Sequence, residues 1–169
     1  MTALLCLAAC RNPSSEYFRN PSFSQLPVKQ RHLLMQIEKS GIQVIKQGMR
    51  FTFVIPIDAY FSRWTHEIKR HQENNLMQLA YFIEDYKHAF RHLRVTVTGY
   101  SDTVYYAPAR DKRSQRDAQL IADALRENGV LIGRIHVKGM GAREPVGDNS
   151  YPMGASFNRR VEVIVDAER

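Results

Sequence analysis

The sequence predicts an α+β fold, a two-layer sandwich in which helices pack on one face of a single mixed β-sheet. Apolar and polar residues alternate in several short segments, and apolar residues recur at helical spacing in the longer segments between them. Alternation of apolar and polar residues is typical of strands, and apolar residues that recur every three to four positions are typical of helices. In chain order the segments form a hairpin, a helix, a strand, a helix and two further strands. At 169 residues, the chain suits one globular domain with an extension.

The strands are predicted from alternation. In IQVIKQGMRFTFVIPI, residues 42–57, two alternating segments flank a Gln-Gly pair, which indicates a β-hairpin. LRVTVTG, residues 93–99, is the next strand, and IHVKG and VEVIV are two further short strands. The apolar residues of the hairpin's second half and of the LRVTVTG strand are Phe51, Phe53, Ile55, Ile57, Leu93, Val95 and Val97.

The helices are predicted from apolar residues that share one side. A short helix is expected over residues 31–39, a second from about Asn75 to Phe90, and a third from about Ala109 to Glu127 with Asn128-Gly129 as its C-cap. Their apolar faces consist of Leu33, Leu34 and Ile37; of Leu76, Leu79, Ala80, Ile83, Tyr86 and Phe90; and of Ala118, Ile121, Ala122 and Leu125.

The first ten residues, MTALLCLAAC, hold both cysteines of the chain, so the remainder can form neither a disulfide nor a thiolate metal site. Leu7-Ala8-Ala9 before Cys10 resembles a bacterial lipobox, in which case Cys10 is the acylated residue. The alternative is an apolar N-terminus without that role. Because no Lys or Arg precedes the segment, we expect that the true start of the protein lies upstream. The resemblance to Gram-negative lipoproteins implies the outer membrane, because Arg11 stands at the position where Asp would favour inner-membrane retention.

These features divide the chain into residues 1–10, the end of a lipoprotein signal; residues 11–40, a linker with a possible short helix; and residues 41–169, the folded domain. The linker is rich in Pro and Ser, which is typical of an extended segment. It also carries Tyr17, Phe18 and Phe23, which are unusual in a passive spacer. Docking of this segment on a neighbouring protein is therefore an alternative to a simple spacer.

Charge and residue types exclude several classes of function. The net charge is +7, but the Lys and Arg residues are mixed with Asp and Glu and form no basic stripe with stacking aromatics, so no nucleic-acid binding is expected. Among the six histidines, His88 and His92 are four apart on a predicted helix, yet no acidic or cysteine ligand has a supporting spacing. No metal and no cofactor are expected. No histidine is arranged with Ser101 and Asp102 in a nucleophile pattern, so the protein is predicted not to be an enzyme.

Four sequence pieces occur in a characteristic order: VTVTGYSD at 95–102, SQRDAQLIADAL at 114–125, VKGMGAREPV at 137–146 and NRRVEVIV at 158–165. Together they resemble the OmpA-like C-terminal domain, a family of envelope modules that grip peptidoglycan. The resemblance covers about residues 42–165 and implies a periplasmic domain on an outer-membrane lipoprotein, lipid-anchored through Cys10. The chain also resembles lipoproteins of the Dot/Icm type IVB secretion apparatus, which implies other secretion-complex subunits as partners.

The resemblance implies a site for the diaminopimelate of a peptidoglycan stem peptide, which carries an ammonium and a carboxylate. Asp102 stands where the family binds the ammonium, and Arg159 matches a family arginine that grips the carboxylate. The alternative for Arg159 or Arg160 is a salt bridge at the sheet edge. Gly139 and Gly141 are expected to be turn glycines at the rim of the site.

The chain departs from the family on the helix after the loop. Aligned without gaps from Asp102, the family asparagine falls on Arg110, its leucine on Arg113 and its carboxylate-binding arginine on Asp117. Arg113, one turn before Asp117, could bind the ligand or pair with Asp117. Arg116 would need a register slip, which the buried face of the helix opposes.

The sequence is compatible with two functions. In the first, the domain anchors or braces an envelope assembly against peptidoglycan, and this assembly is a type IV secretion core complex. Its recognition of diaminopimelate is then weakened or remodelled. In the second, it is a structural scaffold subunit whose OmpA-like domain makes protein contacts and has lost strong peptidoglycan binding.

Overall fold

The computed structural model describes residues 23–90, 92–131, 133 and 135–168. In chain order the elements are α2 (Val28–Lys39), β1 (Gln43–Gln47), β2 (Arg50–Pro56), α3 (Ile57–Tyr60), α4 (Arg70–Lys87), β3 (His92–Gly99), α5 (Ala107–Glu127), β4 (Ile135–Gly139), α6 (Pro152–Asn158) and β5 (Arg160–Glu168). The sheet order is β1-β2-β5-β3-β4. Among the described strands, β3 and β4 pair in parallel, and the other pairs are antiparallel. The predicted hairpin, helices and mixed sheet are confirmed.

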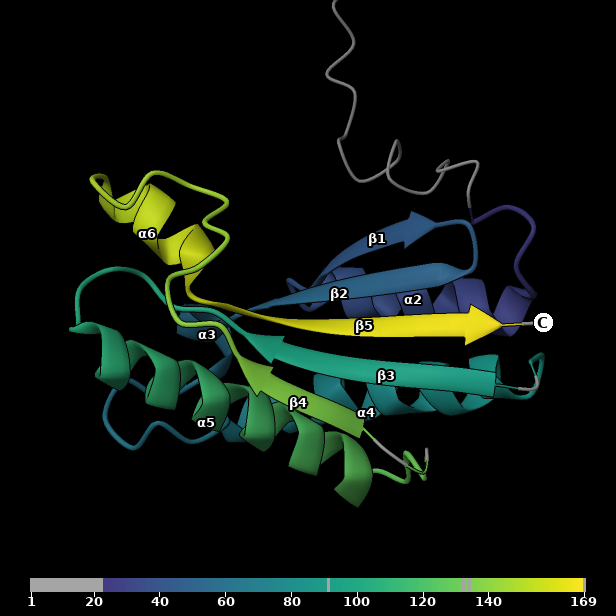
Figure 1. Cartoon of the computed structure of the whole chain (residues 1–169). Coiled ribbons are helices and arrows are strands. Elements are labelled where there is room, and N and C mark those ends of the chain that lie inside the picture. Colours follow the sequence, from purple (N-terminus) through teal and green to yellow (C-terminus); the bar gives the residue numbers. More distant parts are fainter. Residues whose placement is uncertain (1–22, 91, 132, 134, 169) are drawn as a thin grey trace, which may run out of the picture.

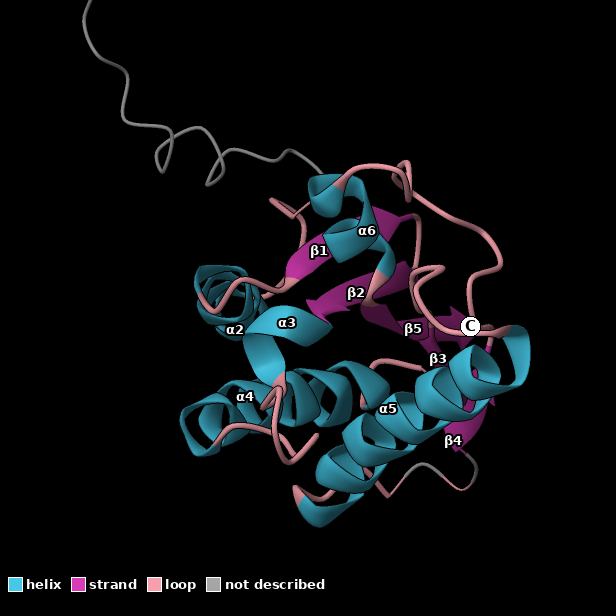
Figure 2. Cartoon of the chain, turned by 90° about the vertical axis from the view of Figure 1, so that its left-hand side faces the viewer, coloured by secondary structure: helices cyan, strands magenta, loops and turns pink. Residues whose placement is uncertain are grey.

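The helices α2, α4 and α5 lie together on one face of the sheet (Figures 1 and 2). The two-layer arrangement predicted from the sequence is therefore confirmed. The short helices α3 and α6 lie near one end of the sheet, where β2 ends and β5 begins. Sequence alternation gave no sign of either short helix. They matter because the candidate site lies at this end.

The core fills the space between the sheet and the three long helices. Alternation places one side of each central strand inward, so Phe53 of β2, Val163 of β5 and Val97 of β3 are neighbours across the sheet and are fully buried. Aromatic rings from α4 pack edge-on against the strands, with Phe82 5.0 Å from Phe51 between ring centroids. The long helices are held by burial of their apolar faces against this layer.

The folded body begins earlier than the predicted boundary at residue 41. The helix α2 starts at Val28, and its Leu34 and Ile37 are buried in the same core as the strands. Phe23 stacks on Phe51 with ring centroids 6.4 Å apart, so this linker aromatic packs on its own domain. Residues 28–40 therefore belong to the domain because their apolar side chains complete its core.

Two details of the predicted elements were wrong. The helix α4 spans Arg70–Lys87, so it begins one turn earlier than expected and ends before Phe90. His88 is its C-cap residue and His92 opens β3, so these histidines do not share a helix face. Cys10, Arg11, Tyr17 and Phe18 lie outside the described residues. Within the described part of the chain, no helix is long and apolar enough to cross a membrane.

Candidate functional site

The helix α5 is held against the ends of β3 and β4 by two glycines that allow close approach. A Cβ atom on Gly99 would lie 1.9 Å from the Ser114 carbonyl oxygen, and one on Gly139 would lie 2.5 Å from the Gln115 nitrogen. Gly139 is thus required by contact between helix and strand, and the expectation of a turn there was wrong. Gly141 has a φ of +55°, and for it the expected turn conformation is present.

Ser114 fixes the rotation of α5 about its axis. Its side chain is fully buried, and its Oγ donates to the Asp111 carbonyl at 3.0 Å and accepts from the Gly141 N–H at 2.9 Å. A register slip of α5 would break these two hydrogen bonds and the close packing of the helix on Gly99 and Gly139. The slip that would bring Arg116 to the position of Asp117 is therefore opposed by the packing of the helix.

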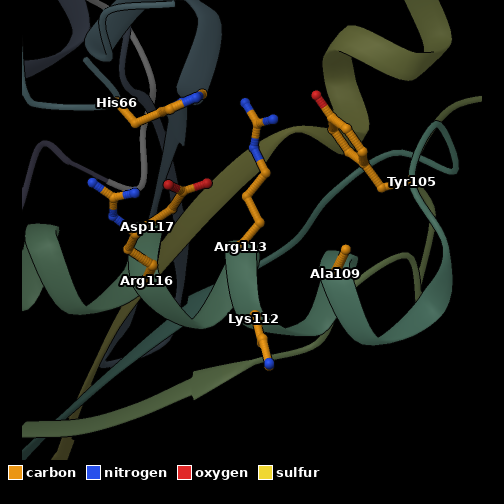
Figure 3. Close-up of a pocket in the computed structure, with 7 residues that line it drawn as sticks. All are labelled: His66, Tyr105, Ala109, Lys112, Arg113, Arg116 and Asp117. Carbon is orange, nitrogen blue, oxygen red and sulfur yellow. The ribbon is translucent and has the colours of Figure 1, made fainter. Parts of the chain in front are cut away.

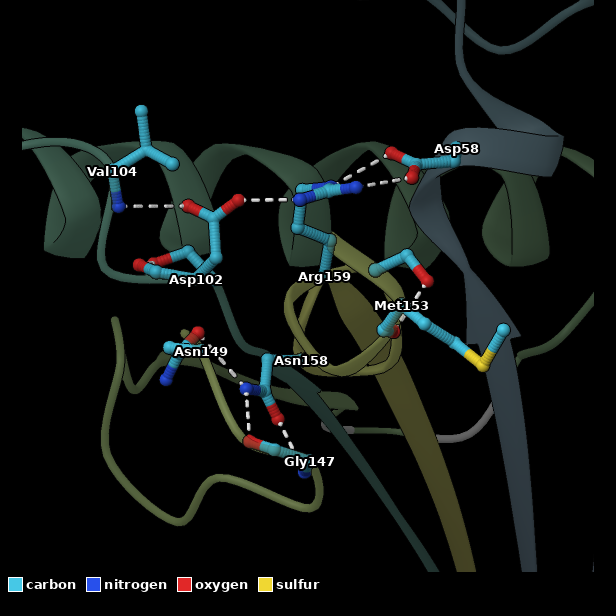
Figure 4. A network of polar contacts seen from close by, with 10 residues as sticks. Asp58, Asp102, Val104, Gly147, Asn149, Met153, Asn158 and Arg159 are labelled. Carbon is cyan, nitrogen blue, oxygen red and sulfur yellow. Dashed lines mark hydrogen bonds and ion pairs between the residues drawn. The ribbon is translucent and has the colours of Figure 1, made fainter. Parts of the chain in front are cut away.

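Asp102 and Arg159 meet at the end of the sheet (Figure 4). Asp102 lies in the loop after β3, and Arg159 lies between α6 and β5. Arg159 Nη1 donates to Asp102 Oδ2 at 2.5 Å, while the Val104 N–H donates to Asp102 Oδ1 at 3.1 Å. Because the two loops pair through the Tyr100 N–H and the Arg160 carbonyl at 2.8 Å, the two side chains are brought together by the backbone of the sheet end.

Asp58, which sequence reasoning missed, is the second partner of Arg159. It lies on α3, directly after β2, and accepts from Arg159 Nε at 2.9 Å and from Nη2 at 2.5 Å. This side-on, two-bond geometry is a strong form of ion pair. The hydrogen bonds that Arg159 donates hold the pKa of the Asp58 carboxyl below its ordinary value, and the acceptance of these bonds by Asp58 and Asp102 raises the pKa of Arg159.

Asn158 supports the site from the other side. Its Oδ1 accepts from the Val146 and Gly147 N–H groups at 2.8 and 3.0 Å. Its Nδ2 donates to the Gly147 carbonyl at 2.7 Å and to Asn149 Oδ1 at 2.9 Å (Figure 4). The amide thus fastens the long loop before α6 to the start of β5. Its place in the Asn-Arg-Arg motif was the only sequence signal for this role.

The two arginines of that motif have separate roles. Arg160 is buried, with its guanidinium 3.8 Å from the centroid of the Tyr100 ring. It donates to Glu162 Oε1 at 2.8 Å and to the Glu144 carbonyl at 3.1 Å. The structural salt bridge that the sequence left open for either arginine is therefore made by Arg160, whereas Arg159 bridges two acids at the site.

A pocket of about 360 Å³ lies beside this cluster, over α5 (Figure 3). It is lined by His66, Tyr105, Ala109, Lys112, Arg113, Arg116 and Asp117. Figure 3 shows Arg113, Arg116 and Asp117 pointing to the same side of the helix, while the amine of Lys112 points away. Arg113 lies over the ring of Tyr105, 5.4 Å from its centroid. The predicted Arg113 and Arg116 therefore belong to the pocket that contains Asp117.

Asp117 is the most unusual residue of this pocket. It is only 5% exposed, and in the described part of the chain its carboxylate has no hydrogen bond and no ion pair within 4.0 Å. Burial raises the pKa of its carboxyl, while the charges of Arg113, His66 and Arg116 act in the opposite direction. Asp117 thus faces the pocket without a direct partner.

The predicted site residues divide into two neighbouring groups and one separate residue. Asp102 and Arg159 are in direct contact, and Arg113 and Arg116 line the pocket. Burial raises the pKa of Asp117 and the hydrogen bonds of Arg159 lower that of Asp58, and the charge of Arg113 acts on both carboxyls in the lowering direction, which links the two groups electrostatically. Arg110 is half-buried and is not among the lining residues.

Fold and site together define a small α+β binding module in which acids and arginines gather at one end of a mixed sheet. The chain belongs to the OmpA family, whose family model matches residues 60–159. It is similar to the structure titled the cell wall anchor of the T6SS from Pseudomonas aeruginosa, at 30% identity with a TM-score of 0.69, over 84% of this chain and 99% of that one.

Two curated relatives match over most of this chain. Outer membrane porin F of Pseudomonas aeruginosa is 30% identical over 78% of the chain, and the probable lipoprotein YiaD of Escherichia coli is 28% identical over 83%. The matched regions span 36% of the porin and 62% of YiaD. The comparison therefore concerns the domain that these proteins share.

Proposed function

We propose that this protein is an envelope lipoprotein whose OmpA-family domain braces an assembly against peptidoglycan by binding the stem peptide. The observation that carries the proposal is the Asp102–Arg159–Asp58 cluster at the end of the sheet. The similarity to a protein described as a cell wall anchor supports the same ligand class. A cluster of fixed opposite charges is suited to a ligand that carries an ammonium beside a carboxylate.

The chemistry of binding follows from the donors and acceptors that remain. Arg159 donates three hydrogen bonds to the two acids, so two of its five N–H groups have no partner among residues 23–90, 92–131, 133 and 135–168. Asp102 and Asp58 keep lone pairs that could accept from a diaminopimelate ammonium. The ligand carbonyl or carboxylate would then take the remaining donors of Arg159 or those of Arg113.

The cellular setting is part of the same proposal. Acylation of Cys10 would tether the domain to the outer membrane on its periplasmic face, and Arg11 favours that membrane. The resemblance to DotK, a lipoprotein of the Dot/Icm type IVB secretion apparatus, supports a core-complex assembly with other secretion subunits as the structure that is braced. The proposed function involves no metal, cofactor, nucleic acid or catalytic step.

A second candidate function is a scaffold subunit whose domain binds proteins. Two observations favour it: Arg159 is already paired with two acids, and apolar side chains are exposed around the same end of the sheet. Val104, Tyr106, Met153 and Phe157 are between 57% and 74% exposed. Such side chains are typical of surfaces that contact a protein partner.

Co-sedimentation with purified sacculi tests the proposal. The full chain should sediment with sacculi, and Asp102→Ala or Arg159→Ala should abolish this. Arg126→Ala is the matched control because it removes an exposed arginine of α5 that pairs with Asp123 far from the cluster. Crosslinking in envelopes before and after wall digestion separates the two functions. Loss of neighbours after digestion supports bracing, whereas persistence of neighbours and no sedimentation support the scaffold.

A further inference from the structure

The pocket beside the cluster contains a buried acid, Asp117, that has no direct partner among the residues that the structure describes. A carboxylate that is largely shielded from water is stabilised when a group in the pocket donates hydrogen bonds to it. Asp117 is 5% exposed and lines the pocket of about 360 Å³. Ser114 holds α5 in place, so the carboxylate cannot leave the pocket by rotation of the helix. The simplest partner is a ligand group that donates hydrogen bonds.

The neighbours of Asp117 restrict what that group can be. Arg113 and Arg116 line the same pocket and influence the Asp117 carboxyl electrostatically. An ammonium would meet these two positive charges, and a carboxylate that an arginine attracts to this wall would also meet the negative charge of Asp117. A primary carboxamide avoids both repulsions because it is neutral. Its N–H groups can donate to Asp117 while its carbonyl accepts from an arginine.

Tyr105 supports the orientation of the arginine. The Arg113 guanidinium lies 5.4 Å from the centroid of the Tyr105 ring, and Figure 3 shows it on the same side of α5 as Asp117. A planar guanidinium over an aromatic face keeps its N–H edge free for a carbonyl oxygen. An acceptor and a donor are thus presented together at one wall of the pocket.

We propose that this pocket selects stem peptides in which the diaminopimelate carboxyl beside the free ammonium has been converted to a primary carboxamide. The inference rests on the proposed function and adds a ligand preference to it. The ammonium of the same residue binds at Asp102 and Asp58, and the carboxamide binds between Asp117 and Arg113. Selectivity arises from the charge of Asp117, which disfavours the free carboxylate.

Isothermal titration calorimetry of the full chain with two synthetic peptides tests this selection. The peptides are the stem tripeptide ending in diaminopimelate with that carboxyl free, and the same tripeptide with it amidated. We expect the wild type to bind the amidated peptide at least about tenfold more tightly, because one like-charge contact is exchanged for hydrogen bonds. Asp117→Arg should reverse the preference in favour of the free acid.

The control is Asp123→Asn, which neutralises an exposed acid of the same helix that bonds to Gln119 and Arg126. It should keep the wild-type preference. Circular dichroism and urea unfolding establish that each variant is folded. Equal affinity of the wild type for both peptides, or tighter binding of the free acid, overturns the inference and leaves the proposed function standing. Binding of neither peptide, together with no sedimentation with sacculi, overturns the proposed function and the inference with it.

Discussion

Removal of Arg159 is expected to destabilise the domain measurably, because the side chain holds two acids that would otherwise face each other. Its three hydrogen bonds to Asp58 and Asp102 measure 2.9, 2.5 and 2.5 Å. Asp102 is 8% exposed as a side chain, so leaving it unpaired costs about 1.5–3 kcal/mol. Asp58 is 37% exposed, and water screens its pair, so this part contributes about 0.5–1 kcal/mol.

Arg159→Ala should therefore lower the free energy of unfolding by about 2–4 kcal/mol. With a urea slope of about 2 kcal/mol/M, the midpoint falls by about 1–2 M, read by far-UV circular dichroism. Arg126→Ala, which breaks an exposed pair, should cost less than about 1 kcal/mol. If Arg159→Ala costs no more than this control, the cluster does not hold the sheet end together and the reasoning is refuted.

The loss should also depend on pH with a definite sign. The pKa of Asp58 is lowered in the folded protein, so its pair with Arg159 stabilises fully above the ordinary value of 3.8 and is lost as the pH falls below it. The difference between wild type and Arg159→Ala should thus shrink in acid. A double-mutant cycle with Asp58→Asn and Arg159→Ala measures the coupling at neutral pH directly.

Three further predictions concern the residues around the site. Asp117→Asn should raise the free energy of unfolding by about 1–2 kcal/mol at pH 7, because burial raises the pKa of this carboxyl. The gain should vanish when the pH is below the ordinary pKa of 3.8, and unfolding curves at pH 7 and below that value check the sign. In thermal melts, Gly139→Ala should lower the free energy of unfolding by at least about 2 kcal/mol, because its Cβ would lie 2.5 Å from the Gln115 nitrogen. Gly133→Ala, whose Cβ would have nothing within 4 Å, should leave it nearly unchanged. Phe23→Ala should cost about 1–2 kcal/mol in urea unfolding through the lost stacking on Phe51, and no change would mean that the domain begins after it.

The elements that could be predicted are those whose own residues determine their form. Phe51, Phe53 and Ile55 alternate because β2 has one buried side, so the hairpin was visible in the sequence. The apolar face of α5 fixed its rotation well enough to place Arg113 and Asp117 on one side. The short helices were not visible because they are too short to show a period.

The missed site residues depend on contacts between distant segments. Asp58 is brought to Arg159 because β2 and β5 pair in a register that sets Pro56 opposite Arg160. His66 lines the pocket through a segment that approaches α5 only in the folded chain, whereas Tyr105 lies just before α5 and lines the pocket from that loop. The apolar side of α2 was visible in the sequence, but its packing into the domain core depends on contacts with the strands and α4, so the sequence alone left it with the linker.

The affinity for the free-acid stem tripeptide tests the central claim most directly, namely that Asp117 and the Asp102–Arg159 cluster form one peptidoglycan-binding surface. Calorimetry would compare the wild-type full chain with Asp117→Arg and with Asp117→Arg combined with Asp102→Ala. We predict that Asp117→Arg binds this peptide at least about tenfold more tightly than the wild type, and that adding Asp102→Ala abolishes the gain. A folded Asp117→Arg protein that binds the peptide no better than the wild type would contradict the account.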